Sequence, residues 1–273
     1  MSYDYETIQV NHQDHIVEVI LNRMDCGNSF NPKMFEEIGS IFSHLETCNK
    51  TRAVILRGAG KSFSYGLDLK QSMSMLKPLL QGGLAQPRNE LRLLIEKWQN
   101  AISAPARLKI PVIAAIHGWC IGAGLDLISA CDLRFCSQDA LFSLREARMG
   151  IVADLGSLQR LPKIIGDAAT RELALTAKDI DAQRAMQLGL VSAVLDSPDE
   201  LWQRAHEEAK CIAANPPLTI QGVKHILNFQ DGKSIGDSLQ YTATWNSAFL
   251  QSEDFAEAIA AFIEKRSPQY KGK

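Results

Sequence analysis

The pattern of apolar and polar positions in the first sixty residues predicts a β-hairpin, a helix and a buried strand. Residues 6–22 hold two stretches in which apolar and polar side chains alternate, one on each side of the polar run NHQDH. This alternation is typical of paired strands. Apolar residues then recur at helical spacing from Asn31 to about Leu45, which predicts an amphipathic helix. The short apolar run RAVILRGAG, which ends in glycines, predicts a buried parallel strand.

The middle of the chain alternates between strand and helix patterns. Residues 69–88 show no persistent period, so we expect a mobile loop beside a site. A helix over about 89–104 leads to the apolar strand IPVIAAIHG, and the pattern of GAGLDLISACD predicts a helix directly after it. Two further short strands, DLRFCS and ALFSL, follow. Strand, glycine-rich turn and helix in succession indicate an α/β fold.

Helical patterns dominate after Gly156, with one strand at LVSAVL. At 273 residues, of which 46% are hydrophobic, the chain is long enough for one large core with an appended segment. We therefore predict an α/β core over residues 1–195 that holds the active site, and a helical segment over residues 196–273.

Charge and composition exclude several classes of partner. The 29 basic and 31 acidic residues give a net charge of −2, so we expect no nucleic-acid or membrane-surface partner. The six cysteines lack paired zinc-ligand spacing and are expected to be reduced thiols. No apolar run approaches the roughly 20 residues of a membrane span. Because neither end of the sequence resembles a targeting signal, we expect a cytoplasmic protein.

Two glycine-bearing turns and three acidic residues are the candidates for chemistry. The turns KSFSYGLDL and GWCIGAGLDL each follow a predicted strand, and a helix that opens at Gly122 or Ala123 leaves amide N–H groups unpaired. Two such amides directed at one carbonyl oxygen form an oxyanion hole. Asp126 lies three residues after Ala123, and Glu146 and Asp154 stand eight residues apart in an apolar setting. Carboxyls buried together in such a setting are costly unless hydrogen bonds or chemistry compensate.

Each acid also has a purely structural interpretation. Asp126 fits a helix-capping or surface role, and Glu146 fits an ion pair with Arg145 or Arg148. Asp154 fits the N-cap of a helix that begins near Leu155. From the residues alone these alternatives stay open.

The chain resembles the crotonase (enoyl-CoA hydratase/isomerase) superfamily over essentially its whole length. KSFSYGLDL is similar to its first oxyanion loop, IPVIAAIHGWCIGAGLDLISACDLRFCS to its central block, and AFIEKRSPQYKG to its C-terminal helix. The resemblance implies an α/β, ClpP-like spiral of ββα units with a helical C-terminal trimerisation segment. It places the oxyanion donors at the backbone N–H groups of Leu67 and Ala123.

Within the superfamily, DLGSLQRLPKIIG and SLQYTATWNSAFLQSED resemble the subgroup that isomerises 3,5-dienoyl-CoA to 2,4-dienoyl-CoA in unsaturated fatty-acid β-oxidation. Asp126, Glu146 and Asp154 match its three acidic positions. The resemblance implies Glu146 as the base at C2, Asp154 as the proton donor at C6, and Asp126 as a group that orients its neighbours. Four bonds of about 1.3–1.5 Å in a zigzag separate C2 from C6 by roughly 5 Å, a span that two carboxyls can flank.

The resemblance also implies the binding partners. Acyl-CoA is the substrate and neither a metal nor a cofactor is expected, while Phe262 and Lys265 are expected to meet CoA bound to a neighbouring subunit of a homotrimer or hexamer. The remaining expected substrate contacts lie in the two turns, at Tyr65, Gly66, Asp68 and Gly124.

The chain departs from the superfamily at three points: no proline follows the Asn-Arg pair, Tyr65 replaces a small residue, and Ala123 replaces a glycine. A 2-enoyl-CoA hydratase is the alternative function. A non-catalytic crotonase-like binding protein is a further one.

Overall fold

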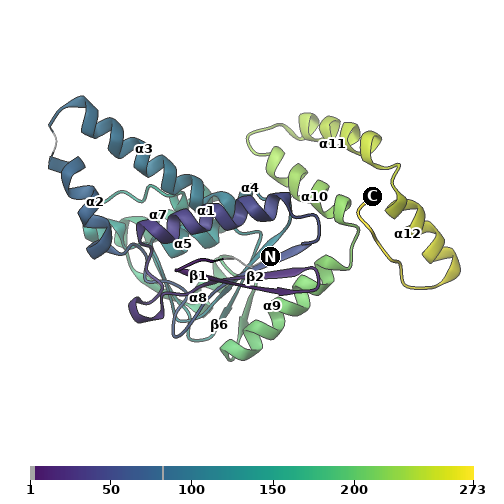
Figure 1. Ribbon diagram of the computed structural model, residues 1–273, viewed down its shortest axis with the longest axis horizontal. Coiled ribbons are helices and arrows are strands. Elements are labelled where there is room, and N and C mark those ends of the chain that lie inside the picture. Colours follow the sequence, from purple (N-terminus) through teal and green to yellow (C-terminus); the bar gives the residue numbers. More distant parts are fainter. Residues whose placement is uncertain (1–3, 82) are drawn as a thin grey trace.

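The computed structural model describes residues 4–81 and 83–273 and contains two sheets (Figure 1). The larger sheet has the strand order β1-β2-β3-β4-β6-β9. Only the β1–β2 hairpin is antiparallel, and the predicted hairpin is thereby confirmed. Its strands are β1 (Ile8–Gln13), β2 (Ile16–Leu21), β3 (Ala53–Gly58), β4 (Val112–Ile116), β6 (Leu133–Ser137) and β9 (Ala193–Leu195).

A smaller sheet lies beside the large one and has the order β5-β7-β8, with β5 (Trp119–Ile121), β7 (Leu141–Ser143) and β8 (Asp179–Asp181). Strand β5 pairs with β7 in parallel, and β7 pairs with β8 in the antiparallel sense. The sequence predicted neither β5 nor β8 as a strand. This sheet brings residues near 120, 143 and 179 together.

Two apolar layers cover the large sheet. Helix α1 (Pro32–Thr47) buries its apolar stripe on one face, and Asn31 caps its first turn by accepting from the Met34 N–H at 2.9 Å. Helix α9 (Pro198–Ala213) covers the other face through Leu201, Ala205 and Ala209. The predicted α/β architecture is confirmed.

The loop predicted over residues 69–88 is wrong. Helix α2 (Leu69–Gln81) begins there, and helix α3 (Ala85–Ile102) starts four residues before the helix expected from residue 89. Apolar residues do recur at helical spacing in α2, at Leu69, Met73, Leu76 and Leu80, but the internal Pro78 and the glycines that follow in the sequence concealed the helix.

Short helices fill the rest of the core, and a helical segment extends from it. The core elements are η1 (Met24–Cys26), α4 (Ala104–Arg107), α5 (Ala123–Ser129), η2 (Glu146–Met149), α6 (Ser157–Ile165), α7 (Asp167–Thr176) and α8 (Ala182–Gln187). Beyond α9 follow α10 (Pro217–Phe229), α11 (Ile235–Phe249) and α12 (Glu253–Glu264), of which α11 and α12 project from the body (Figure 1). The division at residue 195 stays a prediction. Among the described residues, no helix is long and apolar enough to span a membrane.

Candidate active site

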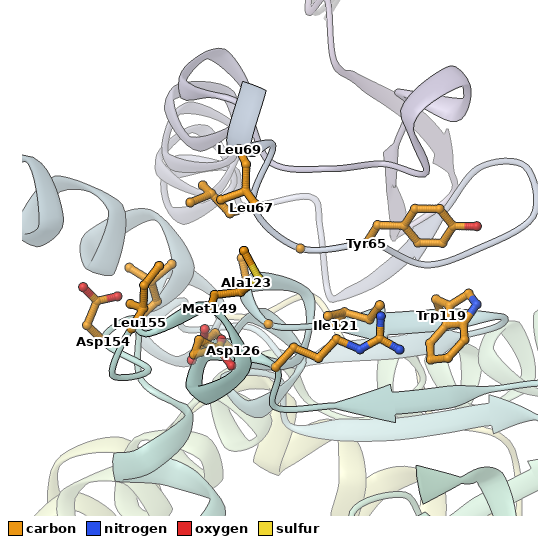
Figure 2. Close-up of a pocket in the computed structure, with 15 residues that line it drawn as sticks. Tyr65, Leu67, Leu69, Trp119, Ile121, Ala123, Asp126, Met149, Asp154 and Leu155 are labelled. Atoms are coloured by element: carbon orange, nitrogen blue, oxygen red, sulfur yellow. The ribbon is translucent and has the colours of Figure 1, made fainter. Parts of the chain in front are cut away.

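The three acids singled out in the sequence line one cavity of about 480 Å³ (Figure 2). Its walls come from the loop before α2, from β5 with the turn into α5, and from η2 with the segment that follows it. Asp154 and Leu155 lie at one end, and Tyr65 and Trp119 lie at the other (Figure 2). Segments far apart in the sequence therefore place Asp126, Glu146 and Asp154 around one space.

In the first wall, Leu67 lies between Gly66 and Asp68, and backbone hydrogen bonds to Phe30 hold both of these residues. Phe30 donates its N–H to the Gly66 carbonyl at 2.7 Å and accepts from the Asp68 N–H at 2.9 Å. The Asp68 carboxylate pairs with Arg23 at 2.9 Å. No acceptor for the Leu67 N–H is found among the described residues, so this amide is available to a ligand.

The second wall is the turn from β5 into α5. Gly122 has φ +50° and ψ −116°, a conformation that strongly favours glycine, and donates its N–H to Ser143 O at 3.0 Å. Ala123 is the first residue of α5 and does not have a positive φ, so its methyl group is accommodated. Its N–H belongs to the first turn and has no acceptor within the described chain.

Asp126 is the most deeply buried acid of the cavity. Its side chain lies on α5, one turn after Ala123, and the residue is 1% exposed. The Ser157 N–H donates to Oδ1 at 2.6 Å. Burial raises the pKa of this carboxyl to about 6, although the hydrogen bond from Ser157 opposes the shift.

Glu146 begins the short helix η2 and faces the oxyanion turn. A Cβ placed on Gly122 would lie 3.1 Å from its Oε1 atom. Its Oε2 atom is buried and has no hydrogen-bond partner within the described residues. Burial and the nearby Asp126 charge raise the pKa of Glu146 to about 7. An unpartnered carboxyl with this pKa is suited to exchanging protons near neutral pH.

Asp154 is the most exposed of the three acids. Partial burial still raises the pKa of its carboxyl above the ordinary range. An apolar ligand that covers Asp154 would remove it further from water and raise its pKa again, which favours the protonated form.

The structural alternatives for two of these acids are not realised. Arg145 and Arg148 pair with Asp179, at 3.0 and 3.9 Å, and not with Glu146. Helix α6 begins at Ser157 after Gly156, and no side chain caps it. Asp126 does serve a structural role as well, because it holds the first amide of α6.

Comparison with known proteins decides the family. The family model described as "Enoyl-CoA hydratase/isomerase" matches residues 11–273. The chain belongs to the enoyl-CoA hydratase/isomerase family. It is 41% identical to a Dictyostelium discoideum protein named Delta(3,5)-Delta(2,4)-dienoyl-CoA isomerase, mitochondrial, with 98% of this chain and 92% of that protein covered. It is 42% identical to an Arabidopsis thaliana protein named Delta(3,5)-Delta(2,4)-dienoyl-CoA isomerase, peroxisomal, with 97% and 96% covered.

Solved structures of family members share the fold. A crystal structure of an enoyl-CoA hydratase from Bacillus anthracis has a TM-score of 0.89 and 32% sequence identity, over 98% of this chain and all of that one. The crotonase fold implied by the sequence is thus confirmed. The expected cytoplasmic location is wrong by the same comparison, because the similar isomerases are named as mitochondrial or peroxisomal.

The other predicted site residues divide into two groups. Tyr65 and Gly66 line the cavity with Leu67 and Ala123. Asp68 lies outside the lining, because Arg23 and the Gln71 N–H bind its carboxylate, and Gly124 packs against Ser64. Phe262 on α12 and Lys265, which directly follows this helix, do not line the cavity of their own chain.

Sequence reasoning placed Tyr65 in the site but missed Trp119 and Arg145 at the end of the cavity opposite Asp154. Trp119 lines it, and the Arg145 guanidinium lies 4.6 Å from the centre of the Trp119 ring. The sequence did indicate that both residues lie near the site, because Arg145 directly precedes Glu146 and Trp119 lies in the predicted central block. Their meeting depends on the β5–β7 pairing, which the sequence did not predict.

Proposed function

We propose that this protein is an isomerase that converts 3,5-dienoyl-CoA to 2,4-dienoyl-CoA in unsaturated fatty-acid β-oxidation. The single observation that carries the proposal is the convergence of three carboxyls on one cavity that also holds two unpaired amides. The same reaction is named for relatives about 40% identical to this chain over 97–98% of its length.

The first step is removal of a C2 proton. The N–H groups of Leu67 and Ala123 bind the thioester oxygen and stabilise the negative charge that develops there. Ionised Glu146 accepts the proton, because its carboxyl faces the turn that bears Ala123. The resulting dienolate carries negative charge along the conjugated chain as far as C6.

The second step returns a proton at C6. Asp154 is the donor, because it lines the end of the cavity away from Tyr65 and Trp119 (Figure 2). The C3–C4 and C5–C6 double bonds become C2–C3 and C4–C5, and the net result is transfer of one proton from C2 to C6. Asp126 raises the proton affinity of Glu146 through its charge. Substrate and product are isomers, so the reaction needs no redox partner, and we assign neither a cofactor nor a metal.

The direction of the substrate follows from the same geometry. With C6 at Asp154, the sulfur atom and the pantetheine arm leave the amides toward Tyr65 and Trp119 (Figure 2). This placement gives Tyr65 and Gly66 a role in substrate binding, whereas Asp68 and Gly124 support the loop and the helix that carry the two amides.

We further propose that the active form is a homotrimer or a dimer of trimers. Apolar side chains on α10–α12 are exposed in the single chain, among them Val223, Leu227, Leu239, Phe255, Ile259, Phe262 and Ile263. Such a surface is typical of an interface. In the oligomer, Phe262 and Lys265 would contact CoA bound to the neighbouring subunit.

The second candidate function is hydration of 2-enoyl-CoA. It is favoured by the names of relatives with lower sequence identity, such as a probable enoyl-CoA hydratase of Bacillus subtilis that is 32% identical to this chain. A hydratase holds one water between two acids, whereas here a third acid, Asp154, lines the cavity beyond them. That third acid favours the isomerase. A non-catalytic binding protein would not need the two acids whose pKa values are raised to about 6 and about 7.

A direct assay separates the candidates. The protein is incubated with 3,5-octadienoyl-CoA while absorbance of the conjugated 2,4-product is followed, and hydration of crotonyl-CoA is measured in parallel. We expect isomerisation to exceed hydration by orders of magnitude. Hydration that dominates by a similar factor would establish the hydratase instead, and no turnover of either thioester would point to a binding protein.

A further inference from the structure

Among the described residues, no side chain forms a hydrogen bond or ion pair with Glu146, the base of the proposed reaction. Glu146 Oε2 is buried and has no hydrogen-bond partner within the described residues. The neighbouring Arg145 and Arg148 form their ion pairs with Asp179 instead. The direction of the Glu146 side chain therefore depends on the backbone of the η2 turn. On the C-terminal side, that turn is closed by the bond from the Ile151 N–H to the Glu146 carbonyl at 3.0 Å.

On the N-terminal side, the turn is held by Arg145. Its guanidinium lies over the Trp119 ring, with 4.6 Å between Cζ and the ring centre. Nε donates to Asp179 Oδ1 at 3.2 Å and Nη2 donates to Oδ2 at 3.0 Å. A two-point contact of this kind fixes the guanidinium in orientation as well as in position.

Asp179 also contacts strand β7, which supports the turn from β5 into α5 that carries the Ala123 amide. The Ser143 hydroxyl donates to Asp179 Oδ1 at 2.6 Å, and the Ser143 carbonyl accepts from the Gly122 N–H at 3.0 Å. Asp179, on β8, thus contacts β7 through Ser143 and is linked to β5 through Arg145 and Trp119, near the turns that carry Ala123 and Glu146.

We propose that Asp179 is a positioning residue that fixes the Glu146 base relative to the Ala123 amide through Arg145 and Ser143. This inference rests on the proposed function. We call Asp179, Arg145, Trp119 and Ser143 the Asp179 clamp. Asp179 does not line the cavity and touches no reacting atom, so its effect is on geometry alone.

The clamp contributes little to folding stability by itself. The side chains of Arg145 and Asp179 are each 33% exposed, and ion pairs with that much solvent access add little to the free energy of unfolding. Burial opposes ionisation of Asp179, but the hydrogen bonds from Ser143 and Arg145 outweigh it and lower its pKa, so the clamp stays charged at neutral pH. Its loss should therefore change the geometry of the site more than the folded fraction.

The test compares Asp179→Asn, Arg145→Met and the double variant with the wild type on 3,5-octadienoyl-CoA. Asp231→Asn is the matched control, because it removes the exposed Lys163–Asp231 pair at 2.5 Å and neither of these residues lines the cavity. We expect Asp179→Asn to lower kcat about tenfold, with KM within about twofold, because small misplacements of a base are costly to the chemical step. The double variant should be no slower than the slower single variant, since both break one unit.

Three outcomes would overturn the clamp while leaving the isomerase intact: wild-type kcat in Asp179→Asn, a loss explained by a smaller folded fraction in circular dichroism, or a rise in KM at constant kcat. An equal loss in Asp231→Asn would overturn it as well. A wild-type protein that does not turn over the diene would instead overturn the proposed function, and the clamp as a catalytic device with it.

Discussion

At the scale of single residues, three carboxyls share one small space and their protonation is coupled. The Asp126 charge is one of the causes that raise the pKa of Glu146 to about 7, the largest being burial. In such a cluster the observed pKa values belong to the group and not to one residue. The proposed base must nevertheless be ionised to act, which makes the rate depend on pH in a defined direction.

We expect kcat/KM for 3,5-dienoyl-CoA to rise with pH through an apparent pKa of about 7, the value that burial and Asp126 give Glu146, and to fall again where Asp154, the proposed donor, loses its proton. Asp126→Asn removes one of the charges that raise this pKa, so the rising limb should move to lower pH. Rate measurements over a pH series for both proteins check this. An unmoved limb would show that Asp126 does not act on the base electrostatically.

The same shift affects stability. The pKa of Glu146 is raised from 4.5 to about 7 in the folded state, so the folded protein binds the proton more tightly than the unfolded chain. Its burial therefore costs no stability below pH 4.5, and the cost grows as pH rises through about 7. Glu146→Gln should then be more stable than the wild type by about 3 kcal/mol at pH 8 and by less than about 1 kcal/mol at pH 5. Urea unfolding at both pH values measures this, and a difference that does not change with pH would contradict it.

Much of the site could be predicted at this scale. Asp126 and Ala123 lie in one continuous strand-turn-helix pattern, so their proximity followed from local sequence. The approach of Glu146 and Asp154 to them came from family resemblance, because each belongs to a different segment and only tertiary packing joins them. The partners of Arg145 were not predictable, because Asp179 lies 34 residues further along the chain.

At the scale of elements, the turn between β5 and α5 sets the position of one proposed oxyanion donor. Gly122 adopts a conformation that other residues rarely take, and a side chain there would approach Glu146 Oε1 to 3.1 Å. Ala123 is helical, so its methyl group requires no special conformation. The glycine requirement therefore falls on position 122.

We expect Gly122→Ala to lower kcat at least about tenfold, because backbone strain of roughly 1–2 kcal/mol moves the amide and the base apart. Ala123→Gly is the matched control and should keep kcat within about threefold. Steady-state kinetics of both variants test this. Equal losses of kcat in the two variants would contradict this prediction, because they would show that the strained conformation of Gly122 is not the cause of the loss.

Elements with a strong apolar pattern were predictable and weakly patterned ones were not. The apolar pattern of α1 predicted that helix to within two residues at its C-terminal end. Helix α2 contains Pro78 and is followed by glycines in the sequence, so its sequence resembles that of a loop although Leu76 packs against the core. Strand β8 reads DID, and its two aspartates serve Arg145 and the first turn of α8 instead of a core.

At the scale of the whole molecule, one buried lysine joins the C-terminal helices to the core. Lys224 on α10 is 5% exposed and its Nζ donates to Asp132 Oδ2 at 2.6 Å, to Pro105 O at 2.8 Å and to Ile110 O at 3.1 Å. The helices that it anchors carry the apolar surface assigned to the oligomer. Loss of this anchor should therefore affect both stability and assembly.

Lys224→Met removes the donor of two carbonyls and the cationic partner of Asp132, which keeps the hydrogen bond from the Val112 N–H, and we expect it to lower the free energy of unfolding by about 2–4 kcal/mol. Lys163→Met, which removes an exposed pair, should change it by less than about 0.5 kcal/mol. Denaturant unfolding compares the two. Equal effects would contradict the role of Lys224 as the anchor.

A second prediction at this scale concerns assembly. Phe262→Asp places a charge on the exposed apolar face of α12 and should shift the protein from a trimer or hexamer toward the monomer. Light scattering after gel filtration measures the mass of both forms. A wild-type protein that runs as a monomer would contradict the assembly while leaving the site within each chain unaffected.

The most direct test of the account separates the two proton transfers in deuterium oxide. Nuclear magnetic resonance follows deuterium at C2 of the recovered substrate and at C6 of the 2,4-dienoyl product. We predict that Asp154→Asn still exchanges the C2 protons but forms product at least about a hundredfold more slowly, whereas Glu146→Gln loses both. Wild-type product formation by Asp154→Asn, or undiminished C2 exchange in Glu146→Gln, would contradict the assignment of the base to C2 and of the donor to C6.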